Sequence, residues 1–471
     1  SAKEEKGITE LEEQIKEMFF GGEISFNDEV YITNARHKAA LEEADKIPAC
    51  IIIAGLALFL YACWRGHMAF ARHLEQEDST AGRMGALALL VIGSLISLWW
   101  YVPQTSIADL WNDVDTYVKQ TQTYSLNYEE RFASLSIEGT QTLAVKSPGT
   151  VIVVIGESAS RNYMKAFTND YAYDDTPWQS QQKANPDFLF FQNAYSSWSQ
   201  TVPVLQRALT EQSQYNDKEF FNSASILDVA KKSGYDTYWF SNQGRYGQYD
   251  SAITLVAKTA DHAEWTDDSY NFSDKYDETL LPYLTQVDPA KNNFIVLHIM
   301  GSHIYYNNRY PESFNKFQGE EGSSTMTSEA SYANSILYTD YILSQVFDYA
   351  KKNLNLQAMV YFSDHGENLT ISHNPDVFSF DMVRIPMWIY LSPSYQSALP
   401  GRTAALRSHG SRYFTNDMLY DTICGLLNAP SERYDPGQDF TSTSYHFNRD
   451  NLTTMLGQYK LSTDPDGNPE Q

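Results

Sequence analysis

The sequence predicts an α/β domain with a mostly parallel sheet flanked by helices, preceded by transmembrane helices. Three observations support this prediction. Apolar runs of strand length alternate with helical patterns over residues 150–450, two uncharged apolar runs come before them, and several strand-like runs end in acidic or imidazole side chains. The chain has 471 residues, enough for a large core, and a net charge of −25, which argues against nucleic acid as a partner.

The N-terminal part of the chain has the pattern of a membrane region. Residues 1–46 are acidic and contain LEEQIKEMFF, which is typical of an amphipathic helix beside a membrane or of an ordinary surface helix. The runs at 47–64 and 85–102 carry no charge and are each long enough to cross a bilayer. The arginine-containing loop between them is expected in the cytoplasm, which places both flanking segments outside. The sequence therefore predicts an extracytoplasmic segment at 1–46 and two transmembrane helices within 47–102, and we expect further transmembrane helices before Ser1.

Residues 103–149 are polar and are expected to link the membrane region to a catalytic domain at 150–450. In that domain we expect strands at 151–155, 237–240, 293–299, 358–362 and 384–391, and helices at 223–235 and 329–351. The run 151–155 shows no alternation, which is typical of a strand buried on both faces, and Gly234 marks the end of the first helix. The polar residues after Asn448 predict a disordered C-terminal tail at 451–471.

Acidic and imidazole side chains gather after the predicted strands. These residues are Glu157, His303, Asp364, His365 and, shortly afterwards, His373. Two carboxylates and three imidazoles are a donor set that suits zinc. Asp364 and His365 are the strongest pair, because adjacent side chains reach one metal only at a turn, and Gly366 permits a turn. The remaining histidines that we considered, His262, His298 and His446, are expected to be ordinary core or surface residues.

A nucleophile is expected within residues 193–210, NAYSSWSQTVPVLQRALT. Pro203 fits the first turn of a helix, and Ser199 and Thr201 lie just before it. Unpaired N–H groups and the positive end of the helix dipole at this position suit a phosphoryl group. Serine and threonine are also common helix caps, so the position alone leaves the roles of cap and nucleophile open.

Several of these motifs occur in an order that resembles a known family. They are GESASRNYM, NAYSS, the Ser/Thr stretch before VP, GYDTYWFSNQ, HIMGSH, and SDHGENL with His373. Together, over roughly residues 150–430, they resemble the phosphoethanolamine transferases that modify lipid A and other surface glycans. These enzymes are membrane-anchored members of the alkaline phosphatase and sulfatase superfamily, so the resemblance implies an alkaline-phosphatase-like sheet.

The resemblance also implies the roles of the site residues. Zn²⁺ would be held by Glu157, Asp364, His365 and the nucleophile, with His303 and His373 at a second metal or at the substrate phosphate. The register with the following ALT slightly favours Ser199 as the nucleophile. Thr201 stays open, because the family usually uses threonine and because sulfatases place their modified residue there relative to proline.

The implied reaction transfers phosphoethanolamine from phosphatidylethanolamine to lipid A or another glycan through a covalent Ser/Thr intermediate. The resemblance further implies a monomer in the bacterial inner membrane with its catalytic domain in the periplasm. The chain departs from the family in three ways. Counting back from VP by the family's commonest spacing lands on Trp198, which cannot act as a nucleophile. Only Cys424 lies in the catalytic domain, so no disulfide can form there, and two transmembrane helices are predicted where the family has five.

Two other functions are alternatives. A phosphoglycerol transferase of the lipoteichoic-acid synthase type shares the fold, the metal and the nucleophile, and it differs in the headgroup pocket. A sulfatase needs Cys or Ser in a C/S-x-P-x-R motif, whereas the corresponding positions here are Thr201, Pro203 and Leu205. That departure disfavours a sulfatase and leaves a sulfatase-like phosphohydrolase as the second alternative.

Overall fold

The structure is a computed structural model that describes residues 123–126, 128–137, 148–244, 252–267, 275–319 and 328–467, together with the isolated positions Arg65 and Ile92. The predicted amphipathic segment and both predicted transmembrane helices fall outside the described residues, apart from those two positions. Within the described part of the chain, every helix is too short or too polar to span a bilayer. The chain divides into the units Ser1–Gln120 and Thr121–Gln471, and the description below concerns the second.

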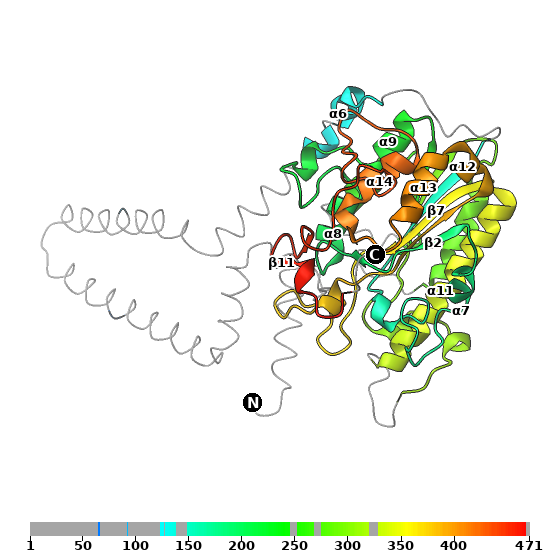
Figure 1. The fold of residues 1–471 in the computed structure, drawn as a ribbon, viewed down its shortest axis with the longest axis vertical. Helices are drawn as coiled ribbons and strands as arrows, with labels where there is room; N and C mark the ends of the chain where they lie inside the picture. Colours follow the sequence, from blue (N-terminus) through cyan, green and yellow to red (C-terminus); the bar gives the residue numbers. More distant parts are fainter. Residues whose placement is uncertain are drawn as a thin grey trace, which may run out of the picture. The chain divides into compact units, whose positions relative to one another are not determined.

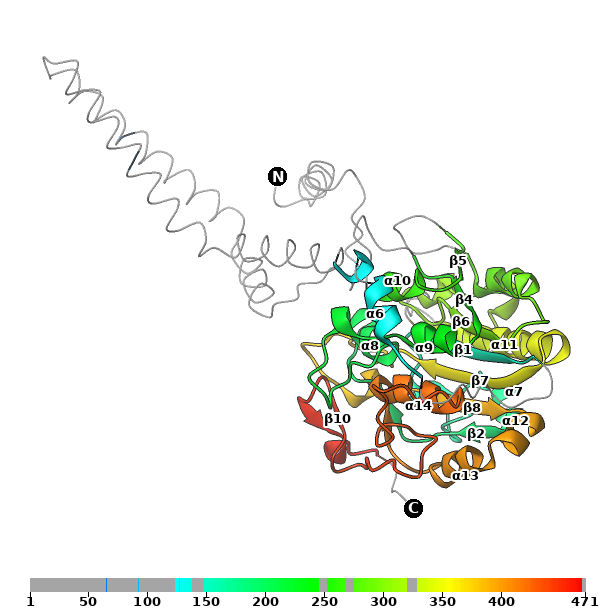
Figure 2. The same cartoon turned by 90° about the horizontal axis from the view of Figure 1, so that it is seen from above.

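A seven-stranded sheet organises the second unit (Figure 1). The order of its strands, β2-β8-β7-β1-β6-β4-β5, can be followed in Figure 2. The strands are β1 (Thr150–Gly156), β2 (Phe188–Phe190), β4 (Asp236–Ser241), β5 (His262–Trp265), β6 (Asn293–His298), β7 (Leu356–Ser363) and β8 (Met387–Leu391). Strand β8 is antiparallel to both β7 and β2, and the other neighbouring pairs are parallel. The predicted mostly parallel sheet is therefore confirmed.

Strand β1 lies in the middle of the sheet and sets the position of the site. It pairs with β6 on one side and β7 on the other, and Ile155 is opposite both His298 and Phe362. Its apolar residues are fully buried, as the uninterrupted apolar run predicts. Because the three strands are parallel, their carboxyl ends meet at one edge of the sheet, and so do the residues that follow them.

Helices cover both faces of the sheet (Figure 2). They are α6 (Tyr128–Ser134), α7 (Pro177–Gln182), α8 (Thr201–Ala208), α9 (Ile226–Lys232), α10 (Ala252–Ala257), α11 (Glu329–Asn353), α12 (Pro393–Ala398), α13 (Pro400–Ser408) and α14 (Leu419–Leu426). Alternate residues of β1 enter two separate cores: Val151, Val153 and Ile155 pack with α8, α9 and α14, and Ile152 and Val154 pack with α11.

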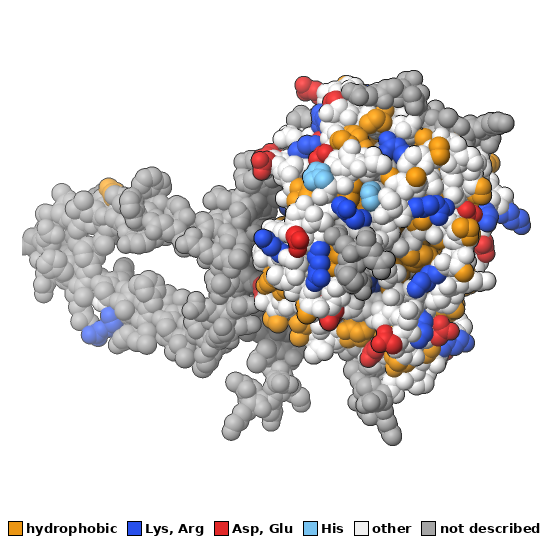
Figure 3. Space-filling model, viewed as in Figure 1, with side chains coloured by type: hydrophobic (Ala, Val, Ile, Leu, Met, Phe, Trp, Pro, Cys, Tyr) orange, Lys and Arg blue, Asp and Glu red, His pale blue; other side chains and the backbone are white. Residues whose placement is uncertain are grey.

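Short elements complete the unit. The two-stranded sheets pair β3 (Ala194–Tyr195) with β9 (Phe414–Thr415), and β10 (Thr453–Thr454) with β11 (Tyr459–Lys460). The 3-10 helices are Arg161–Tyr163, Phe220–Asn222, Asp277–Gln286, Tyr306–Asn308, Glu312–Phe314, Phe380–Met382, Asn416–Met418 and Leu461–Thr463. On the face seen in Figure 3, charged side chains of both signs are interspersed with small groups of hydrophobic ones, as expected of a surface that faces water.

The prediction of a disordered tail is wrong for residues 449–467. Leu452, Met455 and Leu461 are buried in the core. Asp464 is buried as well, where it accepts hydrogen bonds from Arg384 Nε at 2.8 Å and from the Tyr195 hydroxyl at 2.8 Å. The polar composition of this segment predicts disorder because it does not show that Asp464 pairs with the buried Arg384, 80 residues earlier in the sequence.

Candidate active site

The turn after β1 carries Glu157, which is 1% exposed. Ser158 adopts a left-handed conformation with φ of 55°, and its hydroxyl donates to Glu157 Oε1 at 2.7 Å. The backbone N–H of Ser158 donates to Asp364 Oδ1 at 3.1 Å, which links this turn to the turn after β7. Gly301 lies against the same turn, and a Cβ atom there would approach the Glu157 carbonyl oxygen to 2.9 Å. The backbone is thus closely packed around Glu157.

The turn after β7 carries Asp364 and His365, both buried. The N–H of His365 donates to Asp364 Oδ1 at 2.6 Å, and His365 Nδ1 lies 2.8 Å from the Gly366 carbonyl oxygen. A carbonyl oxygen only accepts, so Nδ1 carries the proton of that bond. Burial lowers the pKa of His365, and the neutral ring therefore presents an Nε2 lone pair to the site. Gly366 is needed for close packing here, because a Cβ atom would collide with the Asp381 carbonyl oxygen.

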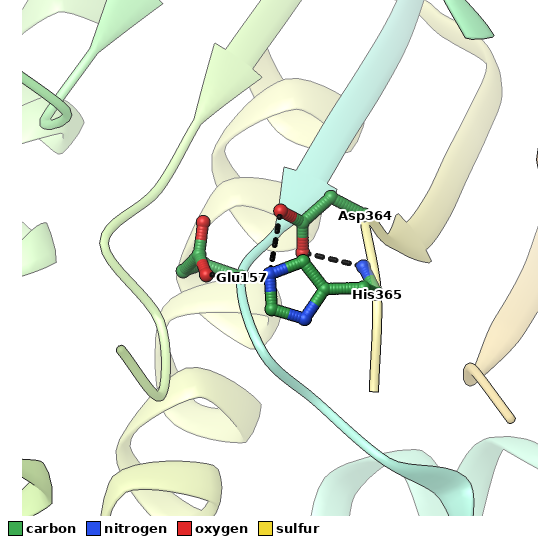
Figure 4. Close-up of side chains that lie close together, drawn as sticks. All are labelled: Glu157, Asp364 and His365. Atoms are coloured by element: carbon green, nitrogen blue, oxygen red, sulfur yellow. Dashed lines mark hydrogen bonds and ion pairs between the residues drawn. The ribbon is translucent and has the colours of Figure 1, made fainter. Parts of the chain in front are cut away.

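Glu157, Asp364 and His365 converge, with one ligand atom from each lying within 4.8 Å of the others (Figure 4). His365 Nε2 lies 3.4 Å from Glu157 Oε1 and 3.5 Å from Asp364 Oδ2. Asp364 Oδ2 is buried and has no hydrogen-bond partner among the described residues. These atoms are all acceptors, so a cation among them would satisfy a group that is otherwise costly to bury. Zinc suits a set of two carboxylates and one imidazole.

Of the two candidate nucleophiles, Thr201 is the one whose hydroxyl contacts this cluster. It is the first residue of α8, and Pro203 lies in the first turn, as predicted. Thr201 Oγ1 donates to Glu157 Oε2 at 3.1 Å and lies 3.5 Å from His365 Nε2. Ser199 is buried too, but its hydroxyl has no hydrogen-bond partner among the residues that the structure describes. The register argument favours Ser199, whereas the geometry favours Thr201.

The two other predicted histidines lie on different loops. His373 Nδ1 is 2.8 Å from Glu367 Oε2, and the rings of His373 and His365 have centroids 4.6 Å apart. His373 therefore borders the cluster. His303 is buried in the loop after β6, where its carbonyl oxygen accepts from Arg309 Nε at 3.2 Å. Within the described chain, His303 is not part of the three-residue ligand set.

Two residues near the cluster were not singled out from the sequence. Gln243 follows β4 and donates from Nε2 to Glu157 Oε2 at 3.3 Å. It could have been found, because it is a polar residue in the turn that follows the predicted strand 237–240. Asn416 contacts the backbone of both Ser197 and Asp364, and no local pattern marks it.

His298 was expected to be an ordinary core residue. It is buried at the end of β6 and lines a small cavity with Trp239, Trp265 and Gln243. Its Nε2 atom has no hydrogen-bond partner among the described residues. Burial lowers the pKa of His298 to about 4, so the ring is neutral at pH 7.

Comparisons with known proteins come from sequence and from structure. The family model described as Sulfatase matches residues 149–429. Phosphoethanolamine transferase EptC of Escherichia coli K12 is 30% identical over 317 residues, which cover 63% of this chain and 54% of the relative. Phosphoethanolamine transferase CptA of Salmonella typhimurium is 28% identical over 317 residues, which cover 64% of this chain and 54% of the relative. The matches thus span about half the length of these curated relatives.

Among solved structures, the C-terminal periplasmic domain of EptC from Escherichia coli, in complex with Zn, is similar to this chain. The identity is 26% and the TM-score 0.62, and the match covers 72% of this chain and 98% of that domain. The similarity supports the alkaline-phosphatase-like arrangement of the sheet.

Proposed function

Because the chain belongs to the sulfatase family, we propose that it is a zinc-dependent phosphoethanolamine transferase that works through a covalent intermediate on Thr201. The observation that carries this proposal is the position of the Thr201 hydroxyl, 3.1 Å from Glu157 Oε2 at the buried Glu157, Asp364 and His365 cluster. The names of the relatives support the choice of phosphoethanolamine as the transferred group.

Glu157, Asp364 and His365 would hold the zinc ion, with Thr201 as a fourth donor. Zinc, when bound, supplies positive charge that neutralises phosphoryl oxygens and lowers the pKa of a coordinated hydroxyl. His365 contributes its unprotonated Nε2, because Nδ1 is bonded to the Gly366 carbonyl oxygen. Ser158 supports Glu157 by donating to Oε1, which leaves Oε2 facing the Thr201 hydroxyl.

The proposed reaction has two displacement steps. In the first, Thr201 Oγ1 forms a bond to phosphorus while the bond from phosphorus to the diacylglycerol oxygen breaks, and diacylglycerol leaves as an alcohol with the proton that the threonine hydroxyl gives up. In the second, the oxygen of an acceptor hydroxyl forms a bond to the same phosphorus, the bond from phosphorus to Thr201 Oγ1 breaks, and the proton of the acceptor hydroxyl restores the threonine hydroxyl. His373, which Glu367 orients, borders the cluster and is suited to bind phosphate oxygens.

We propose phosphatidylethanolamine as the donor and lipid A or another surface glycan as the acceptor. The enzyme would be a monomer in the bacterial inner membrane, with helices at 47–102 and the catalytic domain in the periplasm. The apolar runs of the sequence and the names of the relatives support this placement.

The test compares two fluorescent lipids with the zinc-loaded chain and with the same chain after chelation. We expect release of diacylglycerol from phosphatidylethanolamine, loss of that release in chelator, and recovery on addition of zinc. Release from phosphatidylglycerol alone would contradict the proposal in favour of a phosphoglycerol transferase. If the chain releases diacylglycerol from neither lipid but hydrolyses a phosphomonoester, the result would favour a sulfatase-like phosphohydrolase.

A further inference from the structure

Asn416 lies beside the loop that leads to Thr201, although the two are far apart in the sequence. Strands β3 and β9 pair in parallel, with Tyr195 opposite Thr415. The residues that follow each strand are therefore neighbours: the loop 196–200 follows β3, and Asn416 follows β9. Asn416 is fully buried.

The side chain of Asn416 joins two backbones. Its Oδ1 accepts from the N–H of Ser197 at 3.0 Å, and its Nδ2 donates to the carbonyl oxygen of Asp364 at 2.7 Å. A backbone N–H requires an acceptor and a carbonyl requires a donor, so the two partners determine the orientation of the amide. The side-chain oxygen of Asn416 thus holds the loop 196–200, which we call the nucleophile loop because it leads to Thr201. Its side-chain nitrogen holds the turn that bears the candidate metal ligands Asp364 and His365.

The nucleophile loop is also held from elsewhere. The N–H of Ser196 donates to the Val383 carbonyl oxygen at 2.8 Å, and the Thr454 hydroxyl donates to the Ser196 carbonyl oxygen at 2.7 Å. The N–H of Leu456 donates to the Ser197 carbonyl oxygen at 3.0 Å. These bonds fix the loop to the segment that precedes β8 and to the C-terminal segment. The bonds of Asn416 differ from them, because they connect the loop directly to Asp364, one of the candidate metal ligands.

We propose that Asn416 is a positioning residue that sets the placement of the Thr201 hydroxyl relative to Asp364 and His365. The role in catalysis rests on the proposed function, whereas the effect on the metal site does not. A misplacement of about 1 Å at a reacting group can lower the rate about 100-fold. Because Asn416 bonds to both backbones, we expect its loss to lower the rate strongly. Partners that orient metal ligands typically affect metal affinity about 10- to 100-fold.

The test uses Asn416→Asp and Asn416→Ala in the full chain. The aspartate variant keeps the size of the side chain and the acceptor for Ser197, but it presents an oxygen to the Asp364 carbonyl oxygen. Asn334→Asp is the matched control. Asn334 is also fully buried, accepts from the N–H groups of Lys316 and Phe317 at 2.9 Å each, and donates to the Phe317 carbonyl oxygen at 3.0 Å. The Asn334→Asp variant therefore removes a buried side-chain amide with the same kinds of hydrogen bond, but outside the candidate site.

Zinc affinity, measured by competition with a chelating dye, is the first readout, and the steady-state rate of diacylglycerol release is the second. We expect both Asn416 variants to bind zinc about 10-fold more weakly. At saturating zinc we expect kcat to fall about 100-fold with KM little changed. The Asn334→Asp chain should keep zinc affinity and kcat even where its melting temperature drops.

Wild-type zinc affinity and kcat in a folded Asn416→Asp chain would overturn the inference. Equal losses in Asn334→Asp would overturn it as well, because they would trace the effect to general destabilisation. If the wild type binds zinc but releases no diacylglycerol, the proposed function fails, and the zinc measurements still decide the role of Asn416 at the metal site.

Discussion

Thr201 and Ser199 are two buried hydroxyl residues separated by one residue, and their surroundings differ. The Thr201 hydroxyl contacts Glu157 and lies beside His365, because α8 begins at Thr201 and points its first residue into the cluster. We expect Thr201→Ala to lower the rate of diacylglycerol release by several orders of magnitude, the loss typical of a missing nucleophile. Ser199→Ala should lower it by less than about tenfold. The reverse order of the two variants would restore Ser199 as the nucleophile.

His298 predicts how stability depends on pH. Burial lowers its pKa to about 4 in the folded chain, from about 6.5 for an ordinary histidine. The unfolded chain therefore takes up a proton near pH 6.5, whereas the folded chain does not until about pH 4. Stability should fall as the pH drops through this window, by on the order of 3 kcal/mol in total.

The check is chemical denaturation of wild type and His298→Asn at pH 7 and pH 5, both in chelator so that metal release does not contribute. We expect the variant to lose less stability than the wild type between the two pH values. Equal losses would show that His298 titrates normally in the folded chain.

Among the elements of the fold, the C-terminal segment is held by an ion pair between Asp464 and Arg384, which lies just before β8. Burial alone raises the pKa of Asp464, but the hydrogen bonds and charge of Arg384 outweigh it and leave the pKa below its usual range. Asp464→Asn removes the buried partner of Arg384 and leaves it only the partly exposed Asp381 and the exposed Asp466. We therefore expect this variant to lower the free energy of unfolding by about 3 kcal/mol.

Asp466 provides the control for this pair. It contacts the same Arg384 at 3.1 Å, but its side chain is 75% exposed. Asp466→Asn should therefore change the free energy of unfolding by less than about 1 kcal/mol. Urea denaturation of both variants measures the contrast, and a similar small effect for both would mean that the segment is held mainly by its apolar residues.

The turn after β7 requires glycine for packing. A Cβ atom at Gly366 would meet the backbone of Asp381 and Arg384, which cannot move aside as a flexible side chain can. We expect Gly366→Ala to destabilise the chain by about 1–3 kcal/mol and to weaken zinc binding. Gly401 in α13 has no atom within 4 Å of such a position, so Gly401→Ala should stabilise the chain by about 0.5–1 kcal/mol. The same sign for both variants in urea denaturation would contradict the packing argument.

At the scale of the whole molecule, the parts of the site that follow apolar strands could be predicted from the sequence. Strands β1 and β7 contain the apolar runs 151–155 and 358–362, so Glu157, Asp364 and His365 could be placed at one edge of a parallel sheet. The parts of the structure that depend on contacts between distant segments could not be predicted from the sequence. Asn416 and Ser197 are 219 residues apart and Arg384 and Asp464 are 80 residues apart, and no local pattern encodes either pairing.

Ser199 and Thr201 are close in the sequence, and yet the sequence does not show which of the two hydroxyl groups contacts the cluster. Counting along the chain gives the register of a motif, but it does not give the direction in which each side chain points. The start of α8 decides that direction, and it depends on how the loop before the helix is held by Val383, Asn416 and Leu456.

If the chain transfers phosphoethanolamine through Thr201, the covalent intermediate on that residue can be trapped. The zinc-loaded chain would be mixed with phosphatidylethanolamine in the absence of an acceptor, quenched in acid, digested and analysed by peptide mass spectrometry. We expect phosphoethanolamine on Thr201 of the peptide that spans the start of α8, and none on the same peptide of Thr201→Ala. The modification on Ser199, or diacylglycerol release with no modified peptide, would contradict it.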